Sequence, residues 1–190
     1  MSSAGKKISI AGFALCILAA GLLCLGFFAA AFIDDDYLFD LSDLNIIVNT
    51  LGLFVVTVGY ALKFFGDREI LDLLTAGTAG LAFVITALPM LGVYIFSPAY
   101  THSILMFILG NVLSHLVLLA LGINIMKKGN NFFAMLVMAA FFFLAVGYPF
   151  LMFVVSDSLG DGLYFIILLI CYIVEAAAFA VSALHEIQEG

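Results

Sequence analysis

Two ionisable side chains, His115 and Glu175, are the residues of this chain best suited to chemistry. Each falls near the middle of a long apolar run, at the same distance from the start of that run. A charged group at the centre of a membrane costs about 2.5–3.5 kcal/mol, so each needs a polar partner or a neutral form. Two interpretations stay open for this pair, a proton or ligand site and a structural hydrogen bond between helices.

Amide side chains accompany this pair at helical spacing. Asn111 lies one turn before His115, and Asn49 lies in another apolar run on a face that carries polar and small residues. Steps of three, four and seven residues keep side chains on one face of a helix. Such faces turn toward neighbouring helices, because amide, imidazole and carboxyl groups need partners away from lipid. The sequence therefore predicts a buried polar site for a ligand or a proton, formed by His115, Glu175, Asn111 and Asn49.

No motif in the sequence predicts a metal centre, a cofactor or an enzyme. His185-Glu186 lacks the second His of a zinc-protease HExxH motif, and one His, one Glu and one Asn are too few to predict a metal site. Ser114 beside His115 lacks an evident third partner for a catalytic triad. No basic patch indicates nucleic acid. We therefore expect no metal, no cofactor and no enzymatic activity, and an intramembrane enzyme is the least favoured class.

The elements that position these residues are six apolar runs. The chain is 66% hydrophobic and 10% charged, with a mean hydropathy of +1.29. A soluble domain of 190 residues could not bury so much apolar surface. A membrane-spanning helix needs about 20 apolar residues, which places spans near 8–33, 44–65, 70–96, 103–126, 132–155 and 163–184. We therefore predict an all-α integral membrane protein in which residues 1–190 form a single six-helix transmembrane domain.

The basic residues predict the orientation of these spans. They occur only at alternate ends of the apolar runs: Lys6, Lys7, Lys63, Arg68, Lys127 and Lys128. Short cytoplasmic loops collect Lys and Arg. We therefore expect a multi-pass protein of the cell membrane with both termini in the cytoplasm. Its expected partner is the lipid bilayer, and the sequence leaves open a homo-oligomer or a membrane partner protein.

A shared offset suggests that the spans form repeated hairpins. The same 60 residues separate Pro89 from Pro149 and His115 from Glu175, so one ungapped alignment carries both pairs. Each proline removes a backbone donor, which favours a kink in its helix. The offset predicts three tandem helical hairpins, related as a parallel repeat.

Three stretches resemble the HdeD-like (DUF308) family of small bacterial acid-resistance membrane proteins. They are Ala20–Cys24, Val58–Leu62 and the stretch around Glu175 from Tyr172 to Ala178. The resemblance implies six helices in repeated hairpins and a non-enzymatic, stress-associated or accessory role. The alternative is a small-molecule transporter or its membrane substrate-binding subunit, since the S components of energy-coupling-factor transporters are also six-helix proteins near this size. A packed core would favour the first role, and a core with a bound ligand would favour the second.

Overall fold

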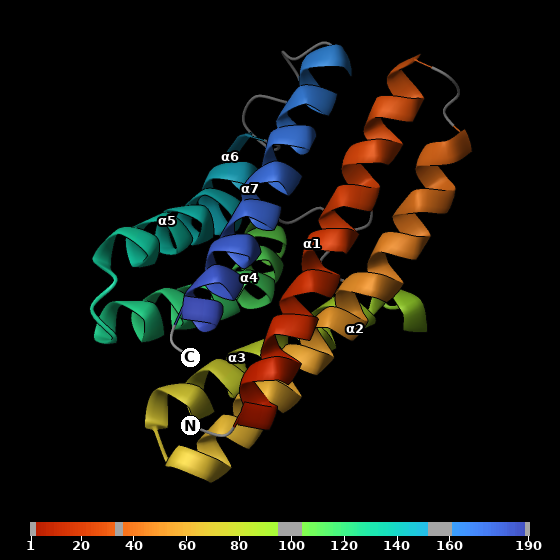
Figure 1. The fold of residues 1–190 in the computed structure, drawn as a ribbon. Coiled ribbons are helices and arrows are strands. Elements are labelled where there is room, and N and C mark those ends of the chain that lie inside the picture. Colours follow the sequence, from red (N-terminus) through yellow and green to blue (C-terminus); the bar gives the residue numbers. More distant parts are fainter. Residues whose placement is uncertain (1–2, 33–35, 95–103, 152–160, 189–190) are drawn as a thin grey trace.

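The computed structural model describes residues 3–32, 36–94, 104–151 and 161–188, and these ranges contain helices and no strand. The elements in Figure 1 are α1 (Ser3–Phe32), α2 (Asp36–Asp67), α3 (Ile70–Ala87), the 3₁₀ turn η1 (Pro89–Leu91), α4 (Ile104–Lys127), α5 (Asn131–Phe142), the π-helical turn η2 (Phe143–Gly147), α6 (Tyr148–Phe150) and α7 (Asp161–Gln188). The predicted all-α fold is confirmed.

Six segments are long and apolar enough to cross a membrane. They are Ala4–Phe28, Leu41–Asp67, Ile70–Leu91, Leu105–Lys127, Asn131–Phe150 and Ile166–Gln188. Each overlaps one of the spans expected from the sequence, and the expected residues 33, 95–96, 103 and 152–155 lie outside the described ones. The chain is therefore a multi-pass membrane protein. Its orientation across the membrane stays a prediction.

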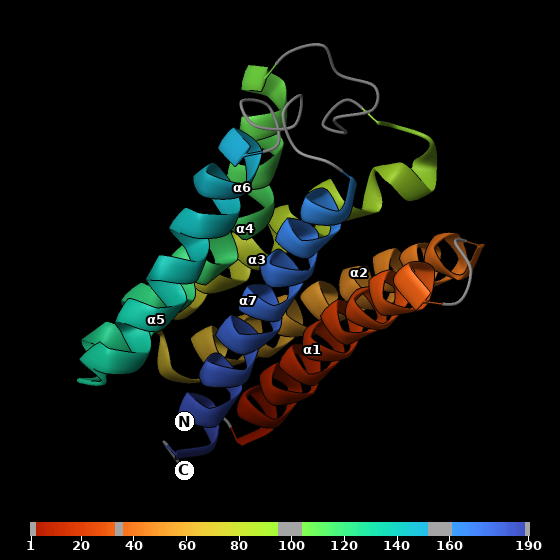
Figure 2. The ribbon, with the colours of Figure 1, turned by 90° about the horizontal axis from the view of Figure 1, so that it is seen from above.

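The spanning segments are arranged as a closed ring. Each one packs against the next along the chain, α7 packs back against α1, and α4 also contacts α7. The start of α1 and the end of α7 lie close together at one end of this bundle (Figures 1 and 2). We call this the terminal end, and the opposite end the distal end. Because successive spans alternate in direction, α2, α4 and α7 finish at the terminal end, and α3 starts there. The predicted pairs α1–α2 and α3–α4 and the pair α5–α7 are all in contact, whereas the repeat itself stays a prediction.

Proline interrupts the regular helix in two places. Pro89 begins η1 directly after α3, and Gly92, with a φ of 74°, ends this turn. Pro149 lies in α6, directly after the π-helical turn η2. Because proline has no N–H group, the carbonyl one turn earlier loses its helical partner. Both prolines therefore stand at departures from regular α-helix, in α3–η1 and α5–η2–α6.

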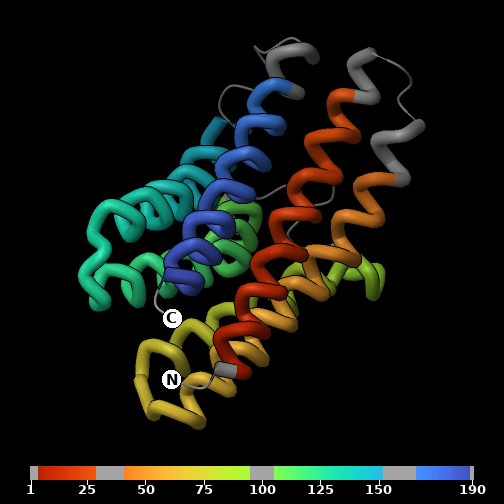
Figure 3. Tube along the Cα trace, in the orientation of Figure 1, coloured from red at the N-terminus to blue at the C-terminus, as the bar shows by residue number. Residues whose placement is uncertain are grey.

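Glycines hold α1 and α2 close together along most of their length, as the tube view in Figure 3 shows. A Cβ atom built on Gly12 would lie 2.6 Å from the backbone nitrogen of Val56, and one built on Gly59 would lie 2.6 Å from that of Ser9. Real side chains do not fit at such distances, so the two backbones can approach only where glycine is present. This pair forms one wall of the ring and fixes the position of α2 within it.

Candidate functional site

A cavity of about 250 Å³ lies inside the ring of helices. Its walls come from α2, α3, η1, α4, η2, α6 and α7, and its polar lining residues are Asn45, Asn49, Thr86, Asn111, Ser114, His115, Tyr148, Tyr172 and Glu175. Most of the lining comes from the first halves of α2, α4 and α7 and from the end of α3, so the cavity extends from the middle of the bundle toward the distal end. The structure thus brings all four residues of the predicted site, from three different helices, to one cavity.

His115 is held in place by its own helix. Its Nδ1 atom lies 2.8 Å from the backbone carbonyl oxygen of Asn111 and 3.2 Å from the Oγ atom of Ser114. A carbonyl oxygen can only accept, so Nδ1 carries the proton, and in the neutral ring Nε2 is an acceptor. The described residues contain no direct hydrogen bond between His115 and Glu175, so the direct form of the predicted contact is not present. A water-bridged contact across the cavity stays a prediction.

Two of the three asparagines of the lining use their amide nitrogens within the protein. Asn111 donates to the backbone carbonyl of Phe107 at 2.9 Å, and Asn45 donates to that of Ala19 at 2.7 Å. The Oδ1 atom of Asn49 is buried and has no hydrogen-bond partner. Since the partners of the first two are carbonyls, their amide nitrogens must face those carbonyls and their Oδ1 atoms are left to accept. The cavity is therefore richer in acceptors than in donors.

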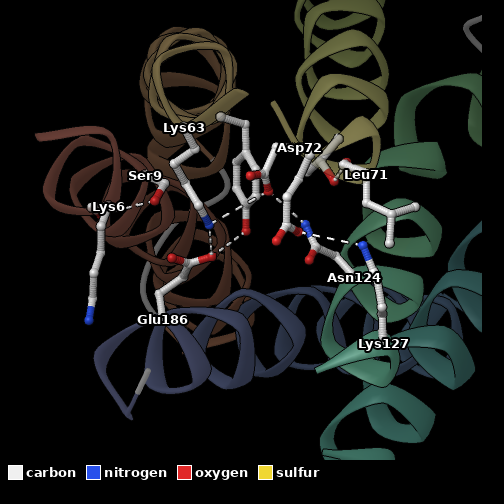
Figure 4. A network of polar contacts seen from close by, with 11 residues as sticks. Lys6, Ser9, Lys63, Leu71, Asp72, Asn124, Lys127 and Glu186 are labelled. Atoms are coloured by element: carbon white, nitrogen blue, oxygen red, sulfur yellow. Dashed lines mark hydrogen bonds and ion pairs between the residues drawn. The ribbon is translucent and has the colours of Figure 1, made fainter. Parts of the chain in front are cut away.

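A second polar cluster lies at the terminal end, and Figure 4 shows it from close by. Lys63, Glu186 and Asp72 are 1%, 1% and 2% exposed. The Nζ atom of Lys63 lies 2.7 Å from Oε1 of Glu186 and 3.8 Å from Oδ1 of Asp72. Tyr60 donates its hydroxyl to the same Glu186 oxygen at 2.7 Å, and its ring lies 4.3 Å from the ammonium. Asn124 completes the cluster by donating to Asp72 Oδ1 at 3.0 Å.

We call these five residues the Lys63 network. It takes Lys63 and Tyr60 from α2, Asp72 from α3, Asn124 from α4 and Glu186 from α7. The same four helices also line the cavity. The network therefore fixes, at the terminal end, the relative positions of the helices that enclose the cavity at the distal end.

Sequence reasoning missed this network. It placed His115 and Glu175 near the middle of their apolar runs and used Lys63 as a marker of cytoplasmic orientation, and it made no prediction that Lys63, Asp72 and Glu186 are buried together. Lys63, Asp72 and Glu186 lie within one or two turns of helix ends, where charged side chains are usually solvated. The available signal was that Lys63 stands between apolar residues, one turn before the end of its helix.

Because the comparisons with known proteins found no match, the site has to be interpreted from its own geometry. Among the described residues, no group of three or more His, Cys, Asp or Glu could hold a metal ion. No family model, no curated protein and no solved structure was found to match this chain.

Proposed function

We propose that this membrane protein binds a small polar molecule in its distal cavity, as a transporter or as the membrane substrate-binding subunit of one. The observation that supports this most is a cavity between spanning helices, with His115 and Glu175 both on its wall. Ionisable groups at this depth in membrane proteins commonly mark substrate or proton pathways. At about 30 Å³ per water molecule, the cavity has room for about eight waters or a small organic molecule.

The stress-associated or accessory role is a second candidate. Its support is the resemblance of Ala20–Cys24 and of the stretch around Glu175 to the HdeD-like family. A packed core would favour that role, and the cavity between α2, α4 and α7 is evidence against it. Binding a small molecule is therefore the function that the geometry supports best.

Gentle purification followed by native mass spectrometry tests this proposal. The wild-type protein should carry a bound small molecule, and Asn111→Leu should lose it, because leucine removes an amide from the cavity wall. The amide of Asn111 bonds only to a carbonyl of its own helix, so its loss should leave the fold intact. Leu109→Ala is the matched control, since this side chain lies on the same helix and is 43% exposed.

The control should retain the bound molecule at the wild-type level. The proposal would be contradicted if the measured mass of the wild-type protein equalled that of the polypeptide alone in every gentle detergent. Equal occupancy in wild type and Asn111→Leu would place the bound molecule outside the cavity.

A further inference from the structure

We infer that the distal cavity binds a primary ammonium group, so that its ligand is an amine or a headgroup that carries one and donates N–H hydrogen bonds. This inference rests on the proposed function and names the class of ligand. It follows from the balance of donors and acceptors on the cavity wall, from the charge of the lining and from the absence of basic side chains among the described lining residues.

Five residues of the lining already use a donor within the protein, namely Asn45, Thr86, Asn111, Ser114 and His115. The amide nitrogens of Asn45 and Asn111 donate to backbone carbonyls. Ser114 donates its hydroxyl to the Asn111 carbonyl at 3.1 Å, and Nδ1 of His115 donates to the same oxygen. Thr86 also donates to a carbonyl of its own helix, that of Ala82, at 3.0 Å. A ligand that needs donors, such as a carboxylate or a phosphate, finds few on this wall.

The acceptors, in contrast, are left without protein donors. The Oδ1 atom of Asn49 is buried with no partner, Nε2 of His115 is an acceptor in the neutral ring, and Glu175 contributes a carboxyl group. A buried acceptor without a donor loses the hydrogen bond that water would give it, so these groups favour a molecule that brings N–H groups. An ammonium with three N–H donors can satisfy several of them at once.

The charge of the lining points the same way. Glu175 is the one acidic residue among the described residues that line the cavity, and none of them is Lys or Arg. An ammonium within a few ångströms of Glu175 favours the ionised form of its carboxyl group. The low dielectric of the interior strengthens the attraction between these two charges. A monocation therefore balances the site.

Primary ammonium fits better than a quaternary one. Quaternary ammonium has no N–H group and is recognised by aromatic faces. The two aromatic side chains of the polar lining already pack on phenylalanines, Tyr172 against Phe27 and Tyr148 against Phe107, each with 5.9 Å between ring centroids. The wall offers amide, imidazole and carboxyl acceptors rather than an aromatic cage.

Such an ammonium has two sources, a free amine and the headgroup of phosphatidylethanolamine. The chemistry of recognition is the same in both cases. A test has to detect the preference for ammonium first and then separate the soluble molecule from the lipid.

Cys171 provides a native reporter, because its side chain lines the cavity one turn before Glu175. With Cys16 and Cys24 replaced by alanine, the protein in detergent is treated with aminoethyl or sulfonatoethyl methanethiosulfonate, which differ in the charge of one end. Rates are divided by those of each reagent with free N-acetylcysteine. The cationic reagent should label Cys171 faster by about tenfold or more, because Glu175 attracts it at short range.

Glu175→Gln should bring the ratio of the two rates close to one. Glu69→Gln is the matched control and should leave the ratio unchanged, since its side chain is 42% exposed at the terminal end. Ile46→Cys, in a background without native cysteines, gives a second reporter on the same wall and should show the same preference.

Competition separates the sources. Ethanolamine should slow labelling of Cys171, and glycolate and ethylene glycol should not. If the lipid is the ligand, labelling should instead slow in phosphatidylcholine nanodiscs only when phosphatidylethanolamine is added.

Two results would overturn the inference in different ways. Equal normalised rates that ignore Glu175→Gln, or protection by glycolate, would reject the ammonium and leave the accessible cavity in place. No reaction at either reporter with either reagent would reject the accessible cavity, and the proposed function with it.

Discussion

Replacing Lys63 with methionine should lower the free energy of unfolding by about 3–5 kcal/mol, because the change leaves buried carboxylates without their cation. The ammonium of Lys63 is 2.7 Å from Glu186 and 3.8 Å from Asp72, and all three side chains are nearly inaccessible. Methionine keeps an unbranched side chain of nearly the same length and removes the ammonium group with its charge and its hydrogen bond to Glu186. The loss should appear as a lower melting temperature in detergent and as a smaller folded fraction in the membrane.

Lys127→Met is the matched control. Its ammonium lies 3.7 Å from Glu69, but the two side chains are 56% and 42% exposed. A solvated pair of this kind contributes about 0–1 kcal/mol, so the melting temperature should hardly change. Adding Glu186→Gln to Lys63→Met should restore part of the lost stability. Equal effects of the Lys63 and Lys127 changes would show that Lys63 is not buried between carboxylates.

Alanine at Gly12 or Gly52 should destabilise the protein by about 1–3 kcal/mol, the usual cost of forcing an extra methyl group into a filled interface. The new Cβ atom would lie 2.6 Å from the backbone nitrogen of Val56 at Gly12, and 2.9 Å from that of Cys16 at Gly52. Backbone atoms cannot move aside without separating α1 from α2. Thermal unfolding in one detergent, followed by the helical signal in circular dichroism, measures the change.

Gly77→Ala in α3 is the control for this effect, since a Cβ atom built on Gly77 would have no neighbouring atom within 4 Å. There the change should be neutral or stabilising, by up to about 1 kcal/mol, because alanine is the better helix former. Valine at Gly52 should be worse than alanine, and valine at Gly77 should be tolerated. If Gly12→Ala and Gly77→Ala melt at the same temperature, α1 and α2 do not approach as closely as described.

The sequence predicts well the features of this fold that depend on local pattern. Apolar length is enough to place six spans, because a bilayer demands about 20 apolar residues per helix. Helical spacing and the cost of polar groups in lipid are enough to predict that Asn49, Asn111, His115 and Glu175 face inward. The structure brings all four to one cavity.

Features that depend on how helices rotate and approach each other could not be predicted in this way. A hydrogen bond between His115 and Glu175 is one of the two interpretations that the sequence leaves open, but the described residues contain no direct one, and Nδ1 of His115 bonds within its own helix. Lys63 and Glu186 are separated by 123 residues, and they meet only because α1 packs against both α2 and α7 when the ring closes. The volume of the cavity depends on how the side chains of several helices pack inside the ring, and this packing cannot be predicted from a local sequence pattern.

A cysteine scan along α7 tests the hollow polar core most directly. Leu168, Cys171 and Tyr172 line the cavity, whereas Ile166, Ile170 and Ile173 are 53%, 45% and 53% exposed on the outside of the bundle. Single cysteines at these six positions, in a background without the other native cysteines, are treated in lipid nanodiscs with a hydrophilic thiol reagent. Only a hydrated thiol ionises and reacts. We expect labelling at 168, 171 and 172 and none at 166, 170 and 173. No labelling at 168, 171 and 172, or equal labelling on both faces, would contradict a water-accessible cavity within the helices.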